Sequence, residues 1–596
     1  MGYNKDKIAD IRPNQFITTF GPGAILDSIN DSLTILDTRY WTDDNKGDEI
    51  YDARLANYLH VHHFFKPNIK KGKNQSTGKS YGLPAIPFPA YHICSKCGLL
   101  FDITKEGNFD KETYNKYSGE VICPKCKKYT KAYPARFVMI CKNGHMDDFP
   151  WSYWVHEGKS CSKANSELYI TTNKRSSTLS ELYVKCTCGV LRSMSGALST
   201  KFECTGKYPF DPSQYRKVKE CKCGAYGSQR GASNVYFGVT RSAISIPPWN
   251  DEIYDLIMAN IKSIDLAKKV PDENSRNLVM QTLVDTYFKP KGYTLEQVNE
   301  ALKKMDSDTK EKLDLKELEY KTITNHQRLS SKKEYTYFKA AEEELYPGLE
   351  KFFSRMILIH RLREVLVLLG HTRLSVPEPD SDDSPSICRL YVSDDDKWLP
   401  ATEIIGEGFF LVLNDETLKS WLSRPMVKTR SDKFTAAYDE YIKGKGWLNT
   451  KPRDAKYVLL HTIAHLLIKE MAMQSGYSST SMHERIYSSP NMAGLLIYTG
   501  AADKEGSLGG LVQLGKRDKF GALLKGALDH ALTCTTDPEC LDKEPDSETI
   551  NGAACHACCM ISETACENGN RMLDRSLLVP LPDHQETAYF KEFFED

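Results

Sequence analysis

The spacing of apolar and polar residues changes along the chain and divides it into four segments. Residues 1–90 combine short apolar runs with turn-forming residues, and residues 91–245 contain short strand-like runs between Gly- and Lys-rich turns. Residues 246–375 place apolar side chains three and four positions apart, as an amphipathic helix does. Residues 376–596 alternate strand-like and helix-like runs. The pattern predicts an α+β multidomain chain with a helical middle region and an α/β C-terminal domain.

Several runs predict particular elements. Thr294 and Gln297 form a capping box at the start of a helix. The run "RLREVLVLLG" is expected to be a helix that ends at Gly370, and "YVLLHTIAHLLIKEMAMQSG" a long buried helix that ends at Gly476. The run "FITTFGPGAILD" predicts a strand followed by a tight turn at Gly21-Pro22-Gly23.

Composition narrows the class of protein. The chain has 596 residues, of which 79 are Lys or Arg and 79 are Asp or Glu, so its net charge is zero. A neutral chain is poorly suited to coating nucleic acid through its overall field, and any contact must come from local basic patches or from a partner. No apolar run approaches the roughly 20 residues of a membrane span, and the N-terminus has no signal-peptide core. We therefore expect a cytoplasmic protein without a membrane segment.

The 18 cysteines lie in two groups, from Cys94 to Cys223 and from Cys534 to Cys566, with Cys388 alone between them. Cytosolic thiols remain reduced, so close spacing favours metal binding over a disulfide framework. Two CxxC pairs 25 residues apart predict a zinc ribbon, since each pair supplies two thiolate ligands from one tight turn. Its ligands would be Cys94, Cys97, Cys123 and Cys126.

The rest of the first group offers eight candidate ligands, which is enough for two further tetrahedral zinc sites. The spacing alone does not assign them to sites. They are Cys141, Cys161, Cys186, Cys188, Cys204 and Cys221, with Cys223 and His145 as alternative ligands; a turn residue is the other interpretation of His145.

Near the C-terminus, the stretch "GAACHACCMISETAC" contains a CxxC pair that predicts a closed structural zinc site with two upstream cysteines. The expected ligands are Cys534, Cys540, Cys555 and Cys558. Cys559 and Cys566 remain possible ligands, and a thiol enzyme using either of them is an alternative, although His556 is the only local base.

His461 and His465 lie one helical turn apart, on one face of the predicted apolar helix. The HExxH motif of metalloproteases requires Glu where this chain has Thr462. The two histidines are therefore expected to be buried and structural. The alternative is a metal-dependent nuclease or hydrolase centred on His461, His465 and Glu484.

The order of several motifs along the chain resembles one known family. The motifs include "RPNQFITTFGPGAILD", "CKNGHMDDFPWSYWVH", "QRGASNVYFGVTRSAISIP", "GYSSTSMHERIY" and "NGAACHACCMISETACENGNRMLDR". Together they resemble the family of B components (DrmB) of the bacterial DISARM antiphage defence system, from residue 12 to residue 575. The adjacent Cys558 and Cys559 depart from that pattern, where one cysteine followed by an aliphatic residue is expected.

The resemblance implies a non-enzymatic zinc-binding subunit with a helicase-associated C-terminal domain. Its implied partner is the superfamily 2 helicase DrmA, which carries the ATPase activity, and a DNA methyltransferase belongs to the same system. The C-terminal domain is expected to dock the helicase. The complex is expected to engage foreign DNA, with phosphate contacts from Lys70, Lys71, Lys73 and Arg230. A solvated loop is the alternative interpretation of the lysine-rich segment.

Overall fold

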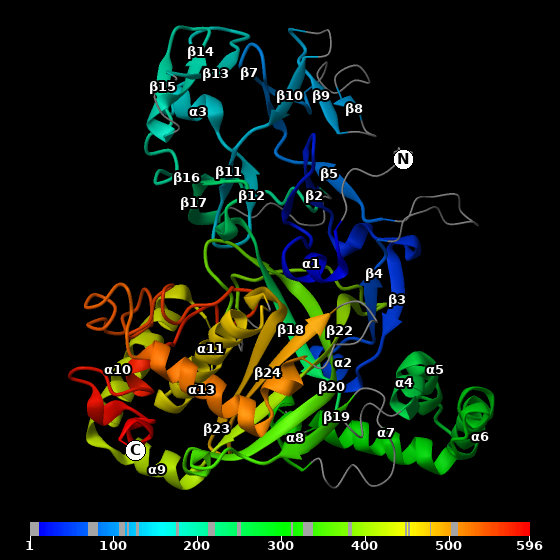
Figure 1. Ribbon diagram of the computed structural model, residues 1–596. Coiled ribbons are helices and arrows are strands. Elements are labelled where there is room, and N and C mark those ends of the chain that lie inside the picture. The colour runs from blue at the N-terminus through cyan, green and yellow to red at the C-terminus, as the bar shows by residue number, and fades with distance from the viewer. Residues whose placement is uncertain are drawn as a thin grey trace.

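A large antiparallel sheet, helices on its flanks and a cysteine-rich region above it make up the computed structural model (Figure 1). The structure describes residues 11–69, 82–105, 114–115, 119–126, 130–173, 178–212, 221–246, 252–310, 314–325, 338–378, 384–447, 450, 453–476, 478–501 and 510–595. None of the helices in these ranges combines the length and the apolar character that crossing a membrane requires.

The central sheet has the strand order β18-β20-β22-β24-β23, with β19, β21, β3 and β4 attached at its sides. These strands pair antiparallel, except that β4 pairs parallel with β22. All four segments expected from the sequence contribute strands to this sheet, and residues 91–245 contribute only β18, so the expected limits near 245 and 375 do not separate independent sheets. The strands are β3 Lys46–Ile50, β4 His63–Pro67, β18 Phe237–Ile244, β19 Lys339–Glu343, β20 Phe353–Thr372, β21 Cys388–Arg389, β22 Trp398–Leu413, β23 Met482–Ser489 and β24 Met492–Ala501.

Two sequence predictions of local structure are wrong. The run "RLREVLVLLG" belongs to strand β20 and is not a helix, and Gly370 lies inside this strand. An added Cβ at Gly370 would lie 2.2 Å from the Cys388 carbonyl oxygen, so glycine allows close pairing with β21. Because both faces of β20 are largely buried, its apolar residues form a continuous run that periodicity cannot distinguish from a buried helix.

The second wrong prediction concerns "FITTFGPGAILD", in which residues Pro13–Thr18 form helix α1 and not a strand. Pro13 occupies the first turn, and the Gln15 side chain accepts a hydrogen bond from the backbone of Arg12 at 3.0 Å. This capping outweighs the β-prone composition of the run. The predicted turn is present, since Gly23 has φ +90°.

Other helix predictions are confirmed. Gln297 Oε1 accepts a hydrogen bond from the Thr294 backbone at 2.9 Å, and the Gln297 backbone donates in return to Thr294 Oγ1 at 3.3 Å. The long apolar helix ends at Gly476, which has φ +69°. The helices of the middle region are α4 Glu252–Ala259, α5 Ile261–Lys268, α6 Glu273–Leu283, α7 Leu295–Lys310 and α8 Leu315–Thr324.

A second helical group, which contains α11, packs beside β22, β23 and β24 (Figure 1). Its apolar side chains merge with those of the sheet and the C-terminal segment into one large core cluster. Helix α11 runs through this core, and ten of its side chains from Tyr457 to Met471 are buried apolar residues of it. The helices are α9 Asp415–Ser423, α10 Pro425–Lys445, α11 Ala455–Ser475, α12 Gly510–Leu514 and α13 Arg517–Ala531.

The cysteine-rich region consists of small antiparallel sheets, the larger two with the orders β15-β14-β13-β7-β6-β10-β9-β8 and β12-β11-β17-β16, and the third with the order β1-β2-β5. Their strands are β1 Ile25–Asp27, β2 Ser32–Ile35, β5 Ala85–Pro87, β6 Tyr91–Cys94, β7 Leu99–Asp102, β8 Tyr114–Asn115, β9 Glu120–Ile122, β10 Lys131–Pro134, β11 Phe137–Ile140, β12 Met146–Asp148, β13 Leu168–Thr172, β14 Leu182–Cys186, β15 Leu191–Ser193, β16 Lys201–Cys204 and β17 Cys221–Gln229. The short helices α2 Ala53–Leu59 and α3 Trp151–Val155 complete the N-terminal part.

Arg373, just after β20, joins this region to the central sheet. Its guanidinium is fully buried and donates to the carbonyl oxygens of Gly144 at 3.0 Å and Gly23 at 2.9 Å, and also to that of Val235. Burial lowers the pKa of Arg373 to about 10. One side chain therefore satisfies carbonyls from three segments that are far apart in sequence.

Candidate metal centres

The structure brings most of the cysteines into clusters of four ligands. All 18 cysteines lie in described residues, and none forms a disulfide. In each of five clusters, four His, Cys or Glu ligand atoms lie within 4.8 Å of one another. This separation suits the edges of one coordination tetrahedron, so each cluster has the donor set and the compactness that a zinc site needs.

The first cluster contains the four predicted ribbon ligands, Cys94, Cys97, Cys123 and Cys126. Two tight turns supply them, one between β6 and β7 and one between β9 and β10. The Sγ atoms of Cys94 and Cys126 are 3.9 Å apart, as are those of Cys97 and Cys123. Gly98 follows the first turn with φ +72°, and an added Cβ would lie 2.4 Å from the Ile170 carbonyl oxygen. The glycine after the CxxC pair is therefore needed for this turn to pack.

Backbone hydrogen bonds favour the thiolate form of one cysteine of this cluster. The N–H groups of Lys96 and Cys97 both lie 3.4 Å from Cys94 Sγ. Although burial opposes the shift, these hydrogen bonds lower the pKa of Cys94 to about 7. Burial raises the pKa of Cys123 to about 12, and the nearby Cys94 adds to that shift. Neighbouring thiolates repel one another, and a bound cation would reduce that repulsion because it stabilises all four thiolates together.

The second cluster lies at the ends of the four strands of the β12-β11-β17-β16 sheet. His145 Nδ1 is 3.2 Å from Cys141 Sγ and 3.5 Å from Cys204 Sγ. Cys221 completes the group, and Asn143 donates to its Sγ at 3.4 Å. Cys223 Sγ lies 3.1 Å from Cys221 Sγ but is not one of the four grouped ligands. The structure thus places His145 beside three thiols with which it could share a metal ion.

The third cluster joins the end of α3 to the turn between β14 and β15. It groups Cys161, Cys186 and Cys188 with His156, which the sequence reasoning missed. His156 Nε2 is 3.4 Å from Cys188 Sγ, while its Nδ1 lies 2.7 Å from the Ser152 carbonyl oxygen. Since that carbonyl requires a proton on Nδ1, the Nε2 lone pair faces the thiols. The spacing of five residues between His156 and Cys161 is the sequence signal that could have identified it.

The fourth cluster follows α13 and contains the predicted C-terminal ligands Cys534, Cys540, Cys555 and Cys558. The Sγ atoms of Cys534 and Cys555 are 3.4 Å apart, and those of Cys540 and Cys558 are 3.7 Å apart. Burial opposes the shift, but the Thr536 hydroxyl and the Cys558 backbone lower the pKa of Cys555 to about 6. Cys540 and Cys558 also belong to the large apolar core, so this cluster closes one end of it.

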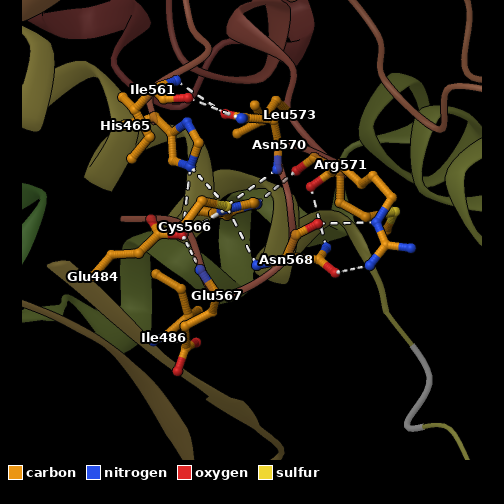
Figure 2. Close-up of polar contacts among 12 residues, drawn as sticks. His465, Glu484, Ile486, Ile561, Cys566, Glu567, Asn568, Asn570, Arg571 and Leu573 are labelled. Atoms are coloured by element: carbon orange, nitrogen blue, oxygen red, sulfur yellow. Dashed lines mark hydrogen bonds and ion pairs between the residues drawn. The ribbon is translucent and has the colours of Figure 1, made fainter. Parts of the chain in front are cut away.

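The fifth cluster lies inside that core and joins His461 and His465 on α11, Glu484 on β23 and Cys566. Figure 2 shows three of these residues, His465, Glu484 and Cys566. All four side chains are buried. Cys566 therefore groups with these residues and not with the fourth cluster. Nothing local in the sequence links it to the histidines, because 101 residues separate it from His465.

The predicted DNA contacts are only partly described. Lys70, Lys71 and Lys73 lie outside the described residues. Arg230 donates to Asp27 at 2.8 Å and to the carbonyl oxygens of Pro134 and Ala135 at 2.9 and 3.1 Å. Arg230 therefore forms an ion pair and hydrogen bonds within the protein. Its contact with DNA stays a prediction.

Comparison with known protein families supports zinc binding at the fourth cluster. Residues 12–237, which contain the first three clusters, match a domain of unknown function (DUF8724). Residues 463–559, which contain the fourth cluster, match the MrfA Zn-binding domain. The match and the four-ligand clusters together make zinc the cofactor of this chain.

A relative with an established name covers nearly the whole chain. The sequence is 40% identical over 580 residues to the DISARM protein DrmB of Bacillus paralicheniformis. The aligned residues cover 95% of this chain and 100% of the relative. The chain therefore belongs to the DrmB family of DISARM proteins.

Proposed function

We propose that this chain is a non-enzymatic zinc-binding subunit of an antiphage DNA-targeting complex. It docks a superfamily 2 helicase, DrmA, which supplies the ATPase activity, and it assists the helicase in engaging DNA. The observation that carries the proposal is that each of the five clusters presents four protein ligands around one point. A structural zinc is closed by four protein ligands, whereas a catalytic zinc keeps one position open for water or substrate.

The buried cluster weighs against the alternative of a nuclease or hydrolase centred on His461, His465 and Glu484. These three side chains are at most 2% exposed. Cys566 Sγ occupies the fourth corner of the cluster, where a hydrolytic metal would hold its water. A scissile phosphodiester would need to reach this point through the packed core.

Two described surfaces carry exposed apolar side chains that suit docking. On the helices of the middle region, Leu266 and Leu278 are 68% and 70% exposed. In the C-terminal region, Met426 on α10 and Met473 on α11 are 49% and 61% exposed. The proposal places the helicase on the C-terminal surface, in line with the helicase-associated domain that the sequence predicts there.

The first experiment measures complex formation and activity with the helicase from the same defence system. Size-exclusion chromatography and a DNA-stimulated ATPase assay would use the chain alone, the helicase alone and both together. We expect no ATPase or nuclease activity from the chain alone, and stimulated ATPase from the complex. DNA cleavage by the chain alone that stops on chelation would overturn the non-enzymatic assignment, and failure to bind the helicase would overturn docking.

Paired variants test the docking surface. Met473→Asp is expected to weaken helicase binding at least tenfold, whereas Leu278→Asp, which places the same charge on the other surface, should leave binding unchanged. The reverse pattern would move the docking surface to the helices of the middle region. Zinc content and melting temperature of both variants should equal those of the wild type.

DNA engagement is tested on the lysine-rich segment. Replacing Lys70, Lys71 and Lys73 together by alanine is expected to weaken DNA binding by the complex and to reduce its salt dependence, because fewer counterions are released. An unchanged salt slope would assign the segment to the solvated loop that is the alternative interpretation.

A further inference from the structure

The buried cluster on α11 gathers ligand atoms from three separate parts of the chain. His461 and His465 lie on α11, Glu484 on β23, and Cys566 on the segment that follows the fourth cluster. The backbone of Glu484 donates to the Ala565 carbonyl oxygen at 3.2 Å, and Glu567 Oε2 accepts from the backbone of Ile486 at 3.0 Å. These hydrogen bonds on either side of Cys566 thus hold it next to β23 without the need for an ion.

Three of the four distances between the inward atoms lie within about 0.1 Å of the edges of a zinc tetrahedron, and the fourth is shorter. With metal–ligand bonds of about 2.0–2.3 Å, neighbouring ligand atoms lie about 3.3–3.8 Å apart. Cys566 Sγ is 3.2 Å from His461 Nε2 and 3.3 Å from His465 Nε2. A Glu484 carboxylate oxygen is 2.9 Å and 3.4 Å from the same two nitrogens. Figure 2 shows His465, Glu484 and Cys566 converging from different elements.

Hydrogen bonds at the outward Nδ1 atoms determine which ring nitrogen carries the proton in each neutral histidine. The inward Nε2 atoms are then unprotonated. His461 Nδ1 lies 3.3 Å from the Met572 carbonyl oxygen, and His465 Nδ1 lies 3.0 Å from the Cys559 carbonyl oxygen. A carbonyl oxygen can only accept, so each Nδ1 carries the proton and each Nε2 presents its lone pair to the cluster. Metal-binding histidines typically have this arrangement, with the outer nitrogen held by a carbonyl or carboxylate.

The other two inward groups are acceptors as well. Cys566 Sγ accepts from the backbone N–H groups of Asn568 and Asn570, both at 3.3 Å, as a thiolate would. Glu484 Oε1 accepts from the Glu567 backbone at 3.2 Å, whereas Glu484 Oε2 is buried without a hydrogen-bond partner among the described residues. Four acceptors that face one another in a dry core repel each other unless a cation lies between them.

We propose that His461, His465, Glu484 and Cys566 bind a fifth Zn²⁺, in a closed structural site that fastens α11, β23 and the C-terminal segment together. Sulfur and imidazole ligands favour Zn²⁺ over the hard cations Mg²⁺ and Ca²⁺, which prefer oxygen. This site lies apart from the fourth cluster, and its outermost ligands, His461 and Cys566, fall outside the matched zinc-binding domain. The inference does not depend on docking to a helicase.

The fifth site is also coupled to the fourth. His465 Nδ1 donates to the carbonyl of Cys559, the residue directly after the ligand Cys558. The segment from Cys555 to Cys566 is therefore held at both ends, by one zinc site at each. Loss of the fifth zinc should loosen this segment without removing the fourth zinc.

The test counts metal in the purified full-length chain. Elemental mass spectrometry should give five zinc ions per chain for the wild type and four for Cys566→Ala. The matched control is Cys388→Ala, which removes a buried cysteine that belongs to none of the five clusters and should retain five. Five ions in Cys566→Ala, or four in the fully loaded wild type, would overturn the proposal.

A second measurement covers the case in which Cys566→Ala folds poorly. In wild-type protein substituted with ¹¹³Cd, the site with one thiolate should give its own resonance, upfield of those from sites with three or four thiolates. Glu484→Gln, which preserves the volume of the side chain, should shift or remove that resonance and leave the other four in place. A wild-type spectrum that contains only resonances typical of three or four thiolates would contradict the fifth site.

Discussion

In the cysteine-rich region, candidate zinc centres lie between small sheets, whereas around α11 they border a large apolar core. The cluster beside the first centre contains only seven buried residues, and two of them, Cys94 and Cys123, are ligands themselves. The core around α11 extends from the sheet through the five helices α9 to α13 to the C-terminal segment. Small cores seldom stabilise a fold without metals or disulfides. We therefore expect zinc to contribute much of the folding free energy around the first centre and to position chain segments around α11.

Removal of zinc should give the largest difference between the regions. Structural zinc in small domains contributes on the order of 10 kcal/mol per site to folding. Chelation is therefore expected to abolish hydrogen-exchange protection in β6, β7, β9 and β10 while β20, β22 and β24 stay protected. Hydrogen exchange measured by mass spectrometry, with zinc added back as the control, checks this. Equal loss of protection in both regions would contradict the comparison.

Two matched ligand variants compare the contribution of zinc at the first centre with that at the fourth centre. Cys126→Ser in the first centre should sharply reduce soluble yield, because little apolar surface surrounds that site. Cys558→Ser in the fourth centre should lose one zinc and lower the melting temperature, yet remain soluble because the core around it persists. Soluble yield, zinc content and melting temperature decide the result. If Cys126→Ser retained normal solubility and full zinc content, the ribbon assignment would be wrong.

The connection between the two regions depends on Arg373. Arg373→Met leaves three buried carbonyl oxygens without their donor, and each unsatisfied group costs about 1–3 kcal/mol before relaxation. We expect a loss of about 3 kcal/mol in unfolding free energy, measured by denaturant titration. Arg361→Met, at an exposed position of the preceding strand β20, is the control and should change stability little. Equal effects of the two variants would show that the hydrogen bonds of Arg373 do not stabilise the contact between the cysteine-rich region and the central sheet.

The smallest effect is expected at Arg230. Its ion pair with Asp27 is partly exposed, and such pairs contribute less than about 1 kcal/mol. Arg230→Lys should therefore change the melting temperature only slightly, and Asp27→Asn should have a similar effect. Fluorescence anisotropy with labelled duplex measures DNA binding by the complex. A clear loss of DNA affinity in Arg230→Lys but not in Asp27→Asn would support the predicted phosphate contact.

Local chemistry explains which features the sequence predicts well. A CxxC pair with a following glycine defines one tight turn, and a capping box or terminal glycine defines one helix end, so neither needs information from distant residues. The ribbon cluster, the C-terminal cluster and the end of α11 at Gly476 follow from such signals. The strand β20 did not, since its apolar run is compatible with a buried helix or a buried strand.

The sequence by itself determined the kind of protein: a neutral, cysteine-rich chain whose thiols bind metal and whose motif order identifies its family. Only the tertiary structure decided which distant residues share a site. His156 joins Cys161, Cys186 and Cys188, and Cys566 meets His461 and His465 instead of the neighbouring thiols. The physical reason is that a tetrahedral site requires four atoms within a few ångströms of one another. Spacing along the chain can guarantee this for two ligands on one turn, whereas for the other two the packing of separate strands and helices decides it.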